Sequence, residues 1–292
     1  MTPRTRAELS LIVVTLVWGS SFVLVKATLD EIAIWLFLAL RFSVAALVLM
    51  VYFGRRATPS GGNKGIRPGI WAGLCLAAGY AFQTFGLRYT TPSKSAFITA
   101  LTSALVPFLV LIVYRKAPHP SEVIGIAVAT VGLGLLTMPS GTLAIGYGDA
   151  ISLCCTVAFA GHILLLGRYA RMVPFEPLSV WQMIVTAMLF WVMVGFTEPV
   201  PKSISLSATG AVLFTGVLCT AIPFTVQAWA QQHTTATRTA LIFAFEPVSA
   251  MITSHAAGAE TLTVRAILGA FLILAGVLTV ELKPESSSEH PF

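Results

Sequence analysis

Two neighbouring residues inside one apolar run stand out for the chemistry they could perform. Residues 241–252 read LIFAFEPVSAMI, with a carboxylate, Glu246, beside a proline, Pro247, near the middle. An ionised carboxylate is costly in lipid, so Glu246 must face a cavity or a partner. Pro247 cannot donate to the carbonyl of Phe243, which leaves a second acceptor beside the carboxylate. This pair suits an ammonium group or an exchangeable proton; the alternative is a protonated or paired glutamate that locks its helix to neighbouring helices.

A basic group that could act with this carboxylate lies elsewhere in the chain. Arg41 is the only basic residue deep inside an apolar block, residues 35–52. Charged residues within such blocks face a partner or a wet cavity. We expect Arg41 either to pair with Glu246 or to bind a carboxylate group of a ligand.

Other kinds of chemistry have little support in the sequence. The motif GYGD at residues 146–149 is similar to the G-x-G-D of intramembrane aspartyl proteases, but Asp149 begins an apolar block, which favours an N-cap role. His162 and His255 have no carboxylate at ligand spacing, and no zinc-protease, Walker or dinucleotide motif occurs. The four cysteines lie in apolar blocks and are expected to be small core residues. We expect no metal, no cofactor and no enzymatic activity.

The composition indicates which elements must position these residues. Of the 292 residues, 56% are hydrophobic and 10% are charged, whereas a soluble domain carries about 25% charged residues. The apolar residues form long blocks, and a bilayer requires about 20 of them per helix. The sequence therefore predicts an all-α polytopic membrane protein. The net charge of +6 does not indicate nucleic-acid binding, because the basic residues lie mostly between the blocks.

Turn and charge clusters between the blocks predict ten transmembrane helices. They run over residues 9–28, 32–52, 69–88, 92–113, 121–138, 148–168, 177–196, 208–229, 236–257 and 264–281. With the amino terminus placed inside, twelve of the 18 Lys and Arg residues lie on the inner side and five on the outer side. This bias predicts that both termini are cytoplasmic, in a bacterial inner membrane. The polar end, residues 286–292, is expected to be a disordered cytoplasmic tail.

The chain also matches itself. A shift of 144 residues places LCLAAGYAFQTFGLRYTTPSKSAFI (74–98) on LCTAIPFTVQAWAQQHTTATRTALI (218–242), and a shift of 141 places WGSSFVLVKA on FAGHILLLGR. Residues 1–140 and 146–285 thus form two halves of five helices each. Because five is odd, the second half enters the membrane from the opposite face. The expected architecture is an inverted repeat with a ligand site between the halves.

Several segments make a family resemblance specific. They are LVWGSSFVLVK, GDAISLCCTVAFAGHILLLGR, SVWQMIVTAMLF, FAFEPVSAM and GAFLILAGVLTV. With them the chain resembles the ten-helix, EamA-like exporter branch of the drug/metabolite transporter superfamily over nearly its whole length. One turn departs from the family pattern, since RKAPHPSE has lost the Gly-Glu pair expected after the fourth helix. The resemblance implies a metabolite exporter, with amino acids prominent among its substrates.

Polar residues at repeat-equivalent positions predict a central cavity. Glu246 falls on Thr102, and three further pairs, Gln227 with Gln83, His162 with Ser21 and Gln182 with Arg41, also keep polar groups at matching depth. The alternative is that these groups only hydrogen-bond neighbouring helices, at about 0.6 kcal/mol each. We predict that the cavity is lined by Trp18, Ser21, Arg41, Tyr80, Gln83, Thr99, Thr102, Phe159, His162, Gln227, Phe243 and Glu246.

Prolines and glycines have separate expected roles. Pro107, Pro223 and Pro247 each remove a helical donor, which predicts local bends beside the cavity that act as gating hinges or only give the helices a fixed shape. Small residues at positions 125, 132, 269 and 276 predict close helix packing, and a homodimer contact is left open.

These features favour a secondary transporter that exports small amphipathic metabolites, most of all amino acids including aromatic ones, by alternating access. The expected partners are a small-molecule substrate and the lipid bilayer, and proton coupling and facilitated diffusion both stay open. Export of drugs, nucleosides or cationic toxic compounds is the alternative. A membrane enzyme lacks a catalytic constellation, and a non-transporting scaffold does not explain the paired polar residues.

Overall fold

The computed structural model describes residues 1–57, 65–137, 146–197, 203–259 and 261–281, and every regular element in these ranges is helical. The all-α prediction is therefore confirmed for the described part of the chain. The expected tail, 286–292, lies outside these residues. The described elements are α1 (Pro3–Thr28), α2 (Ile34–Phe53), η1 (Gly54–Ala57), α3 (Ile66–Arg88), α4 (Pro92–Ala100), α5 (Thr102–Tyr114), α6 (Pro120–Thr137), α7 (Tyr147–Tyr169), α8 (Phe175–Thr197), α9 (Leu206–Gly216), η2 (Val217–Ala221), α10 (Ile222–Ala230), α11 (Ala236–Phe243), α12 (Glu246–Ala256) and α13 (Val264–Glu281).

Seven helical stretches in the described ranges are long and apolar enough to cross a membrane. They are α1, α2, α3, α7, α8, the α4–α5 pair, and the run from α9 to α10. The apolar parts of α6 and α13 are shorter, and the predicted helix 236–257 is divided into α11 and α12. The ranges predicted to be transmembrane helices are thus largely helical in the described residues. That the chain crosses the membrane ten times remains a prediction.

Three of the predicted helices are interrupted. The α4–α5 pair breaks at Leu101, and α11 and α12 are separated by two residues directly before Glu246. A π-helical turn, η2, joins α9 to α10. Pro223 and Pro247 each lie at the second residue of the helix that follows an interruption, where a missing N–H is tolerated. Pro107 differs, because it lies inside α5, six residues after the break.

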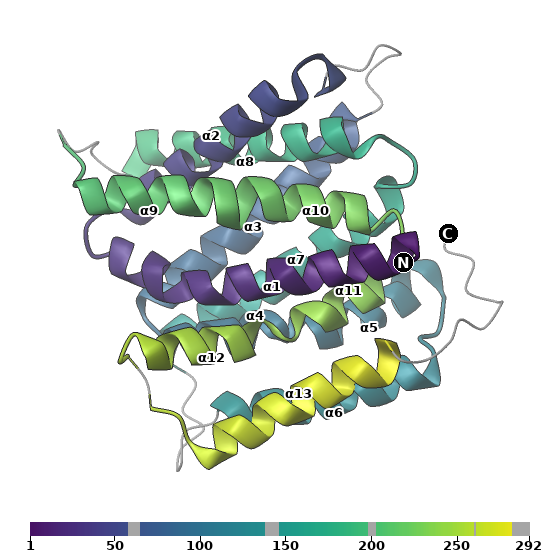
Figure 1. Ribbon diagram of the computed structural model, residues 1–292. Coiled ribbons are helices and arrows are strands. Elements are labelled where there is room, and N and C mark those ends of the chain that lie inside the picture. Colours follow the sequence, from purple (N-terminus) through teal and green to yellow (C-terminus); the bar gives the residue numbers. More distant parts are fainter. Residues whose placement is uncertain (58–64, 138–145, 198–202, 260, 282–292) are drawn as a thin grey trace.

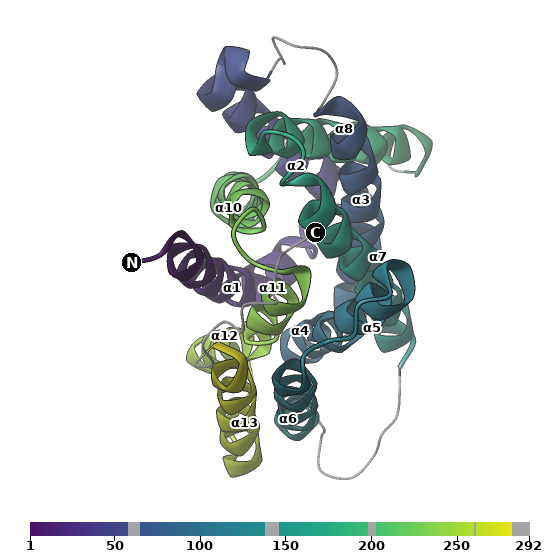
Figure 2. The same ribbon diagram turned by 90° about the vertical axis from the view of Figure 1, so that its right-hand side faces the viewer.

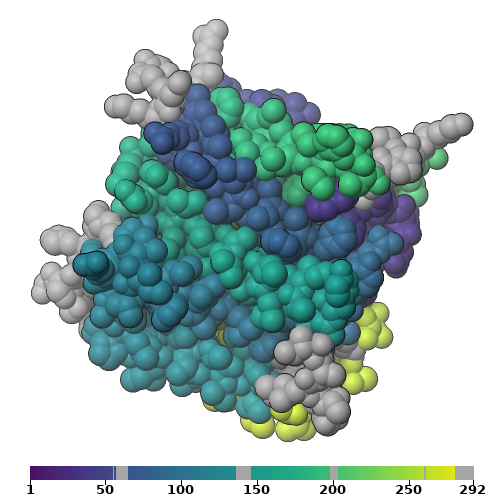
Figure 3. All heavy atoms as spheres, turned by 180° about the vertical axis from the view of Figure 1, so that it is seen from behind, coloured from purple at the N-terminus to yellow at the C-terminus, as the bar shows by residue number. Residues whose placement is uncertain are grey.

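The bundle has two edges and a centre. In Figure 1 most helices run across the view, with α2 and α8 along one edge and α6 and α13 along the other, and α1 begins on the side where α13 ends. The view turned by 90° shows the same two edge pairs, with α1, α3, α7, α10 and α11 between them (Figure 2). On the face shown in Figure 3, α7 packs against both α3 and α5. The centre therefore gathers helices from both halves of the chain.

The apolar side chains fill two different environments. Phe37, Phe42 and Phe190 are fully buried between α2, α3 and α8 and anchor the largest core cluster. Many large apolar side chains, such as Phe196 and Leu206, are instead exposed on the outside of the helices. This distribution fits helices surrounded by lipid, in which outward apolar side chains cost nothing.

The predicted glycine faces pack against each other. A methyl group on Gly132 would lie 2.6 Å from the carbonyl oxygen of Gly269, and one on Gly276 would lie 2.4 Å from that of Gly125. Helices α6 and α13 therefore approach closely within one chain, as small residues allow. Since these faces are covered internally, they give no argument for a homodimer.

Candidate functional site

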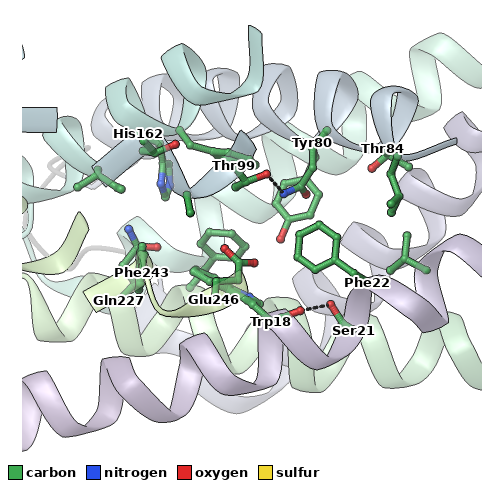
Figure 4. A pocket seen from close by; sticks show the side chains of 18 of the residues that line it. Trp18, Ser21, Phe22, Tyr80, Thr84, Thr99, His162, Gln227, Phe243 and Glu246 are labelled. Carbon is green, nitrogen blue, oxygen red and sulfur yellow. Dashed lines mark hydrogen bonds between the residues drawn. The ribbon is translucent and has the colours of Figure 1, made fainter. Parts of the chain in front are cut away.

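One pocket lies between the two halves of the chain. The empty space in it is about 750 Å³, a figure that includes space open to solvent. Side chains from both halves surround it (Figure 4). All twelve predicted cavity residues line it, together with Phe22, Val25, Thr84, Leu87, Ala100, Ser103, Ile163, Phe224 and Ala240. That these residues bind a substrate remains a prediction.

Aromatic rings form much of the wall of the pocket. The Trp18 ring lies 4.9 Å from that of Phe243 and 5.1 Å from that of Phe224, measured between centroids. Tyr80 makes edge contacts with Phe159 at 5.5 Å and with Phe224 at 6.0 Å. The Trp18 indole donates to the carbonyl of Cys219 over 2.8 Å, so its ring is held in place. The wall offers a rigid apolar surface with polar groups at its margins.

Glu246 lies in this wall as the first residue of α12. Its side chain points into the pocket (Figure 4), and the residue is only 6% exposed. Within the described residues its carboxylate makes no hydrogen bond or ion pair. The helix N-terminus behind it supplies a partial positive charge that favours an anion. The carboxylate is thus buried, aimed at the pocket and available to a ligand or a proton.

The close approach of α1 to α12 fixes the position of this carboxylate. A Cβ atom on Gly19 would lie 2.4 Å from the carbonyl oxygen of Glu246 and 2.6 Å from the Cβ of Ser249. Ser249 also donates its hydroxyl to the carbonyl of Leu16 over 2.7 Å. Only a glycine at position 19 permits this contact, which holds the first turns of α12 directly against α1.

Arg41 reaches the pocket from α2 and is held by neutral groups. Its Nε donates to the Thr220 hydroxyl over 2.7 Å, and its Nη2 donates to the Tyr80 hydroxyl and the Cys219 carbonyl, each over 3.2 Å. The guanidinium carbon also lies 4.7 Å from the centroid of the Tyr80 ring. No ion pair joins Arg41 to Glu246 in the described part of the chain. The pocket therefore contains a guanidinium group and a carboxyl group that do not pair with each other.

Amide and imidazole groups complete the polar part of the lining. Gln83 donates to the Thr99 hydroxyl over 3.0 Å, and Gln227 donates to Gln231 over 3.2 Å. His162 is joined to Gln182 through Nε2 and Oε1 at 2.9 Å, which keeps its imidazole facing α8. Ser21 donates to the carbonyl of its own helix at Trp18 over 2.7 Å.

Besides the Glu246 carboxylate, two fully buried polar atoms of the lining lack a partner within the described residues. The Thr102 hydroxyl and the Oε1 atom of Gln227 are buried without a hydrogen bond within the described residues. An unpaired buried polar group costs about 1–3 kcal/mol, which a ligand or a water molecule in the pocket would relieve. Both atoms belong to the pocket lining and mark places where it can bind a polar group.

Comparison with known proteins shows the family. The sequence profile of the EamA-like transporter family matches residues 5–138 and again residues 147–282. The chain belongs to the EamA-like transporter family. This assignment places it in the drug/metabolite transporter superfamily and, with its apolar helices, makes it a multi-pass membrane protein.

Relatives of this EamA-like transporter agree with the assignment. An uncharacterized transporter of Archaeoglobus fulgidus is 32% identical over 96% of this chain and 87% of the relative. The uncharacterized transporter YyaM of Bacillus subtilis is 30% identical over 89% of this chain and 88% of the relative. A crystal structure of another protein, 20% identical, superposes with a TM-score of 0.79 and covers 95% of this chain and 98% of that chain. That likeness concerns the fold alone.

One central residue of the EamA-like pocket, Phe224, is not among the lining residues that the sequence predicts. Its ring contacts those of Trp18, Tyr80 and His162. The 144-residue shift places Tyr80 on Phe224, so the repeat contained the signal. The three prolines do not line the pocket, and their expected role as gating hinges remains a prediction.

Proposed function

We propose that this EamA-like transporter exports amino acids, including aromatic ones, from the cytoplasm as a secondary transporter. An amino acid is a zwitterion that carries an ammonium and a carboxylate on one carbon. The pocket offers Glu246 to the first group and Arg41 to the second, and its aromatic wall suits an apolar side chain. The separation of these two charges by neutral partners is the observation on which the proposal rests.

We further propose ten membrane crossings arranged as two inverted halves, with both termini in the cytoplasm of a bacterial inner membrane. The breaks support this arrangement, because Leu101 and Phe245 are 144 residues apart and α4–α5 and α11–α12 divide at equivalent positions. The two matches to the family profile, one in each half, support the duplication. Alternating access then follows from two halves that exchange conformations around a fixed site.

The source of energy is a further part of the proposal. Glu246 is the only carboxylate that lines the pocket within the described residues, so it is the group through which a proton would compete with the ammonium of a substrate. Proton exchange is the first candidate, and facilitated diffusion is the other.

Counterflow in vesicles that contain only this protein tests the substrate. Vesicles preloaded with one unlabelled amino acid take up the same labelled compound transiently if the protein carries it, and all twenty amino acids can be screened in this way. We expect uptake of aromatic and large aliphatic amino acids, reduced by at least about tenfold in the Glu246→Ala variant. Absence of counterflow for every amino acid would exclude the proposed substrate class.

A second substrate class is favoured by one observation. Aromatic rings next to a buried carboxylate also suit hydrophobic organic cations, which bind through cation–π contacts and charge. Such compounds have no carboxylate for Arg41 to bind, so their transport does not require this guanidinium. Transport of an organic cation that survives Arg41→Gln, in the absence of amino-acid counterflow, would identify this alternative.

A further inference from the structure

A polar cluster closes one end of the pocket region. The Thr90 hydroxyl donates to Asp149 Oδ1 over 2.7 Å, and Lys94 Nζ lies 2.6 Å from Asp149 Oδ2. Lys26 donates to the carbonyl of the same Thr90 and to that of Leu87, the latter over 3.1 Å. We name Lys26, Thr90, Lys94 and Asp149 the Asp149 cluster. It ties the turn between α3 and α4 to α1 on one side and to α7 on the other.

A second cluster of the same construction lies at the other end of α1. The Thr234 hydroxyl donates to Glu8 Oε1 over 3.1 Å, and Arg238 Nη1 lies 3.8 Å from the same oxygen. Arg171 donates to the carbonyl of Thr234 over 3.3 Å, and Arg4 also pairs with Glu8, at 2.8 Å. We name Glu8, Arg171, Thr234 and Arg238 the Glu8 cluster. It ties the turn between α10 and α11 to α1 and to the turn directly after α7.

The repeat relates the two clusters residue by residue. Thr90 and Lys94 correspond to Thr234 and Arg238 at a shift of 144, and Glu8 corresponds to Asp149 at a shift of 141. The remaining pair, Lys26 and Arg171, is offset by one helical turn. At a shift of 141 Lys26 corresponds to residue 167, whereas the basic side chain that donates to the threonine carbonyl is that of Arg171, four residues later. In each cluster a threonine joins α1 and α7, the first helices of the two halves. Such agreement of chemistry at equivalent positions is not expected of unrelated surface ion pairs.

The clusters lie at opposite ends of the bundle. Glu8 and Lys26 are separated by 18 residues of α1, which corresponds to about 27 Å along a helix. The Asp149 cluster adjoins the pocket, since Val25 and Leu87 line it and Lys26 binds the carbonyl of Leu87. The two clusters therefore hold α1 and α7 against the same pocket at its two ends.

The two clusters differ in the distances from their members to the carboxylate. Thr90 and Lys94 lie 2.7 and 2.6 Å from Asp149, which also accepts from the Gly146 N–H over 2.9 Å. Thr234 and Arg238 lie 3.1 and 3.8 Å from Glu8, whose shortest contact is the one with Arg4 at 2.8 Å. The Glu8 cluster is the more buried one, as the Arg238 and Glu8 side chains are 5% and 10% exposed and that of Lys94 is 31% exposed. The bonds of both clusters are formed in this conformation, so α1 and α7 are held together through the two threonines at both ends of the pocket.

We propose that the Asp149 and Glu8 clusters are the two latches of the transport cycle, one at each face of the membrane. Opening the pocket to one face requires α1 and α7 to separate there, which breaks the cluster at that face and leaves the other intact. Transport alternates between the two broken states. The proposal rests on the proposed transport function, but it concerns the gates and is independent of the substrate.

Thiol labelling from each face of the membrane tests the latches. The background protein has its four cysteines replaced, and Ser21→Cys places a single reporter in the pocket. A membrane-impermeant maleimide is added to sealed vesicles of known orientation. Asp149→Asn is expected to increase labelling from the Asp149 face by about tenfold, because one charge-assisted bond is lost from the closed end. Glu8→Gln is expected to increase labelling from the opposite face.

Matched variants separate a latch from a general loss of stability. Thr90→Val and Thr234→Val remove only a hydroxyl and should repeat the two opposite effects, while Lys94→Arg should retain labelling as in the background protein. Glu122→Gln alters a buried acid that accepts from the backbone of its own turn, at His119, and should change labelling from neither face. Equal changes at both faces, or no change in any of the four cluster variants, would overturn the latches. Opposite shifts without amino-acid counterflow would retain them and reject the substrate.

Discussion

The rings of Tyr80 and Phe224 lie 6.0 Å apart in the pocket, inclined at 69°, although 144 residues separate them in the chain. The same shift relates the two halves of the sequence, so these residues are equivalent positions that meet each other. Contact between equivalent residues is expected at the axis that relates two repeats. In the inverted arrangement that we propose, the aromatic centre of the pocket lies near this axis, where we expect a rearrangement of the halves to move side chains least.

Replacing Glu246 by Gln keeps the shape of the side chain and removes its charge. We expect transport to fall by at least about tenfold, because an ammonium group loses a charge-assisted partner. The initial rate of counterflow, measured across a range of pH, checks this. Unchanged activity with an unchanged pH profile in a normally inserted protein would rule out both the substrate role and the proton role of Glu246.

Replacing Arg41 by Lys tests whether the guanidinium fork matters. Arg41 uses Nε and Nη2 to reach three neutral acceptors, and an ammonium cannot reproduce this planar arrangement. We expect Arg41→Lys to raise the half-saturating concentration of an amino acid by about tenfold. The same variant should leave unaffected the transport of any substrate that lacks a carboxylate.

Replacing Pro247 by Ala restores an N–H near the start of α12. If the break between α11 and α12 acts as a hinge, a donor for the Phe243 carbonyl will favour a continuous helix and slow the transport rate. The ratio of the transport rate of Pro247→Ala to that of the unchanged protein, both at saturating substrate, measures this effect. A transport rate and a substrate range equal to those of the unchanged protein would leave only a fixed shape for this break. Pro107→Ala gives a comparison, because Pro107 lies inside α5 rather than at a break and does not line the pocket.

Replacing Gly19 by Ala inserts a methyl group where α1 meets α12. The new Cβ would lie 2.4 Å from a backbone oxygen that cannot rotate away, so α1 must shift. We expect a loss of about 1–3 kcal/mol in the free energy of unfolding. The thermal midpoint of the purified protein in detergent checks this. Gly195→Ala is the matched control, since nothing lies within 4 Å of a Cβ built there, and it should not lower the midpoint.

The turn after α1 provides a prediction on pH. Glu31 accepts hydrogen bonds from the hydroxyls of Ser205 and Ser207, and these bonds hold the pKa of its carboxyl below the ordinary value of 4.5. A lowered pKa means that the contact stabilises the fold above the unfolded pKa, and that this contribution is lost as the pH falls through the folded value. The difference in thermal midpoint between the unchanged protein and Glu31→Gln should therefore shrink in acid. A difference that stays constant down to about pH 3 would contradict this.

The sequence predicts much of the helical arrangement and of the pocket lining, because composition and apolar length define membrane helices. The helix ends and the cavity residues follow from apolar length and from the repeat. The partners of Arg41 do not, since Thr220 and the Cys219 carbonyl become available through the π-helical turn η2, which no pattern of residue types announces. The glycines of α6 and α13 are predictable as packing residues, but only three-dimensional contacts show that the two faces cover each other.

The pairing of α6 with α13 also constrains how the protein is made. Each of these helices ends one half of the chain, and their glycine faces contact each other rather than a helix of their own half. Because α13 follows α6 by 144 residues, the glycine face of α6 enters the membrane early and stays uncovered until synthesis of the chain is almost complete. Neither half can reach its final packing alone, so the two halves depend on translation as one polypeptide, or on meeting soon after insertion.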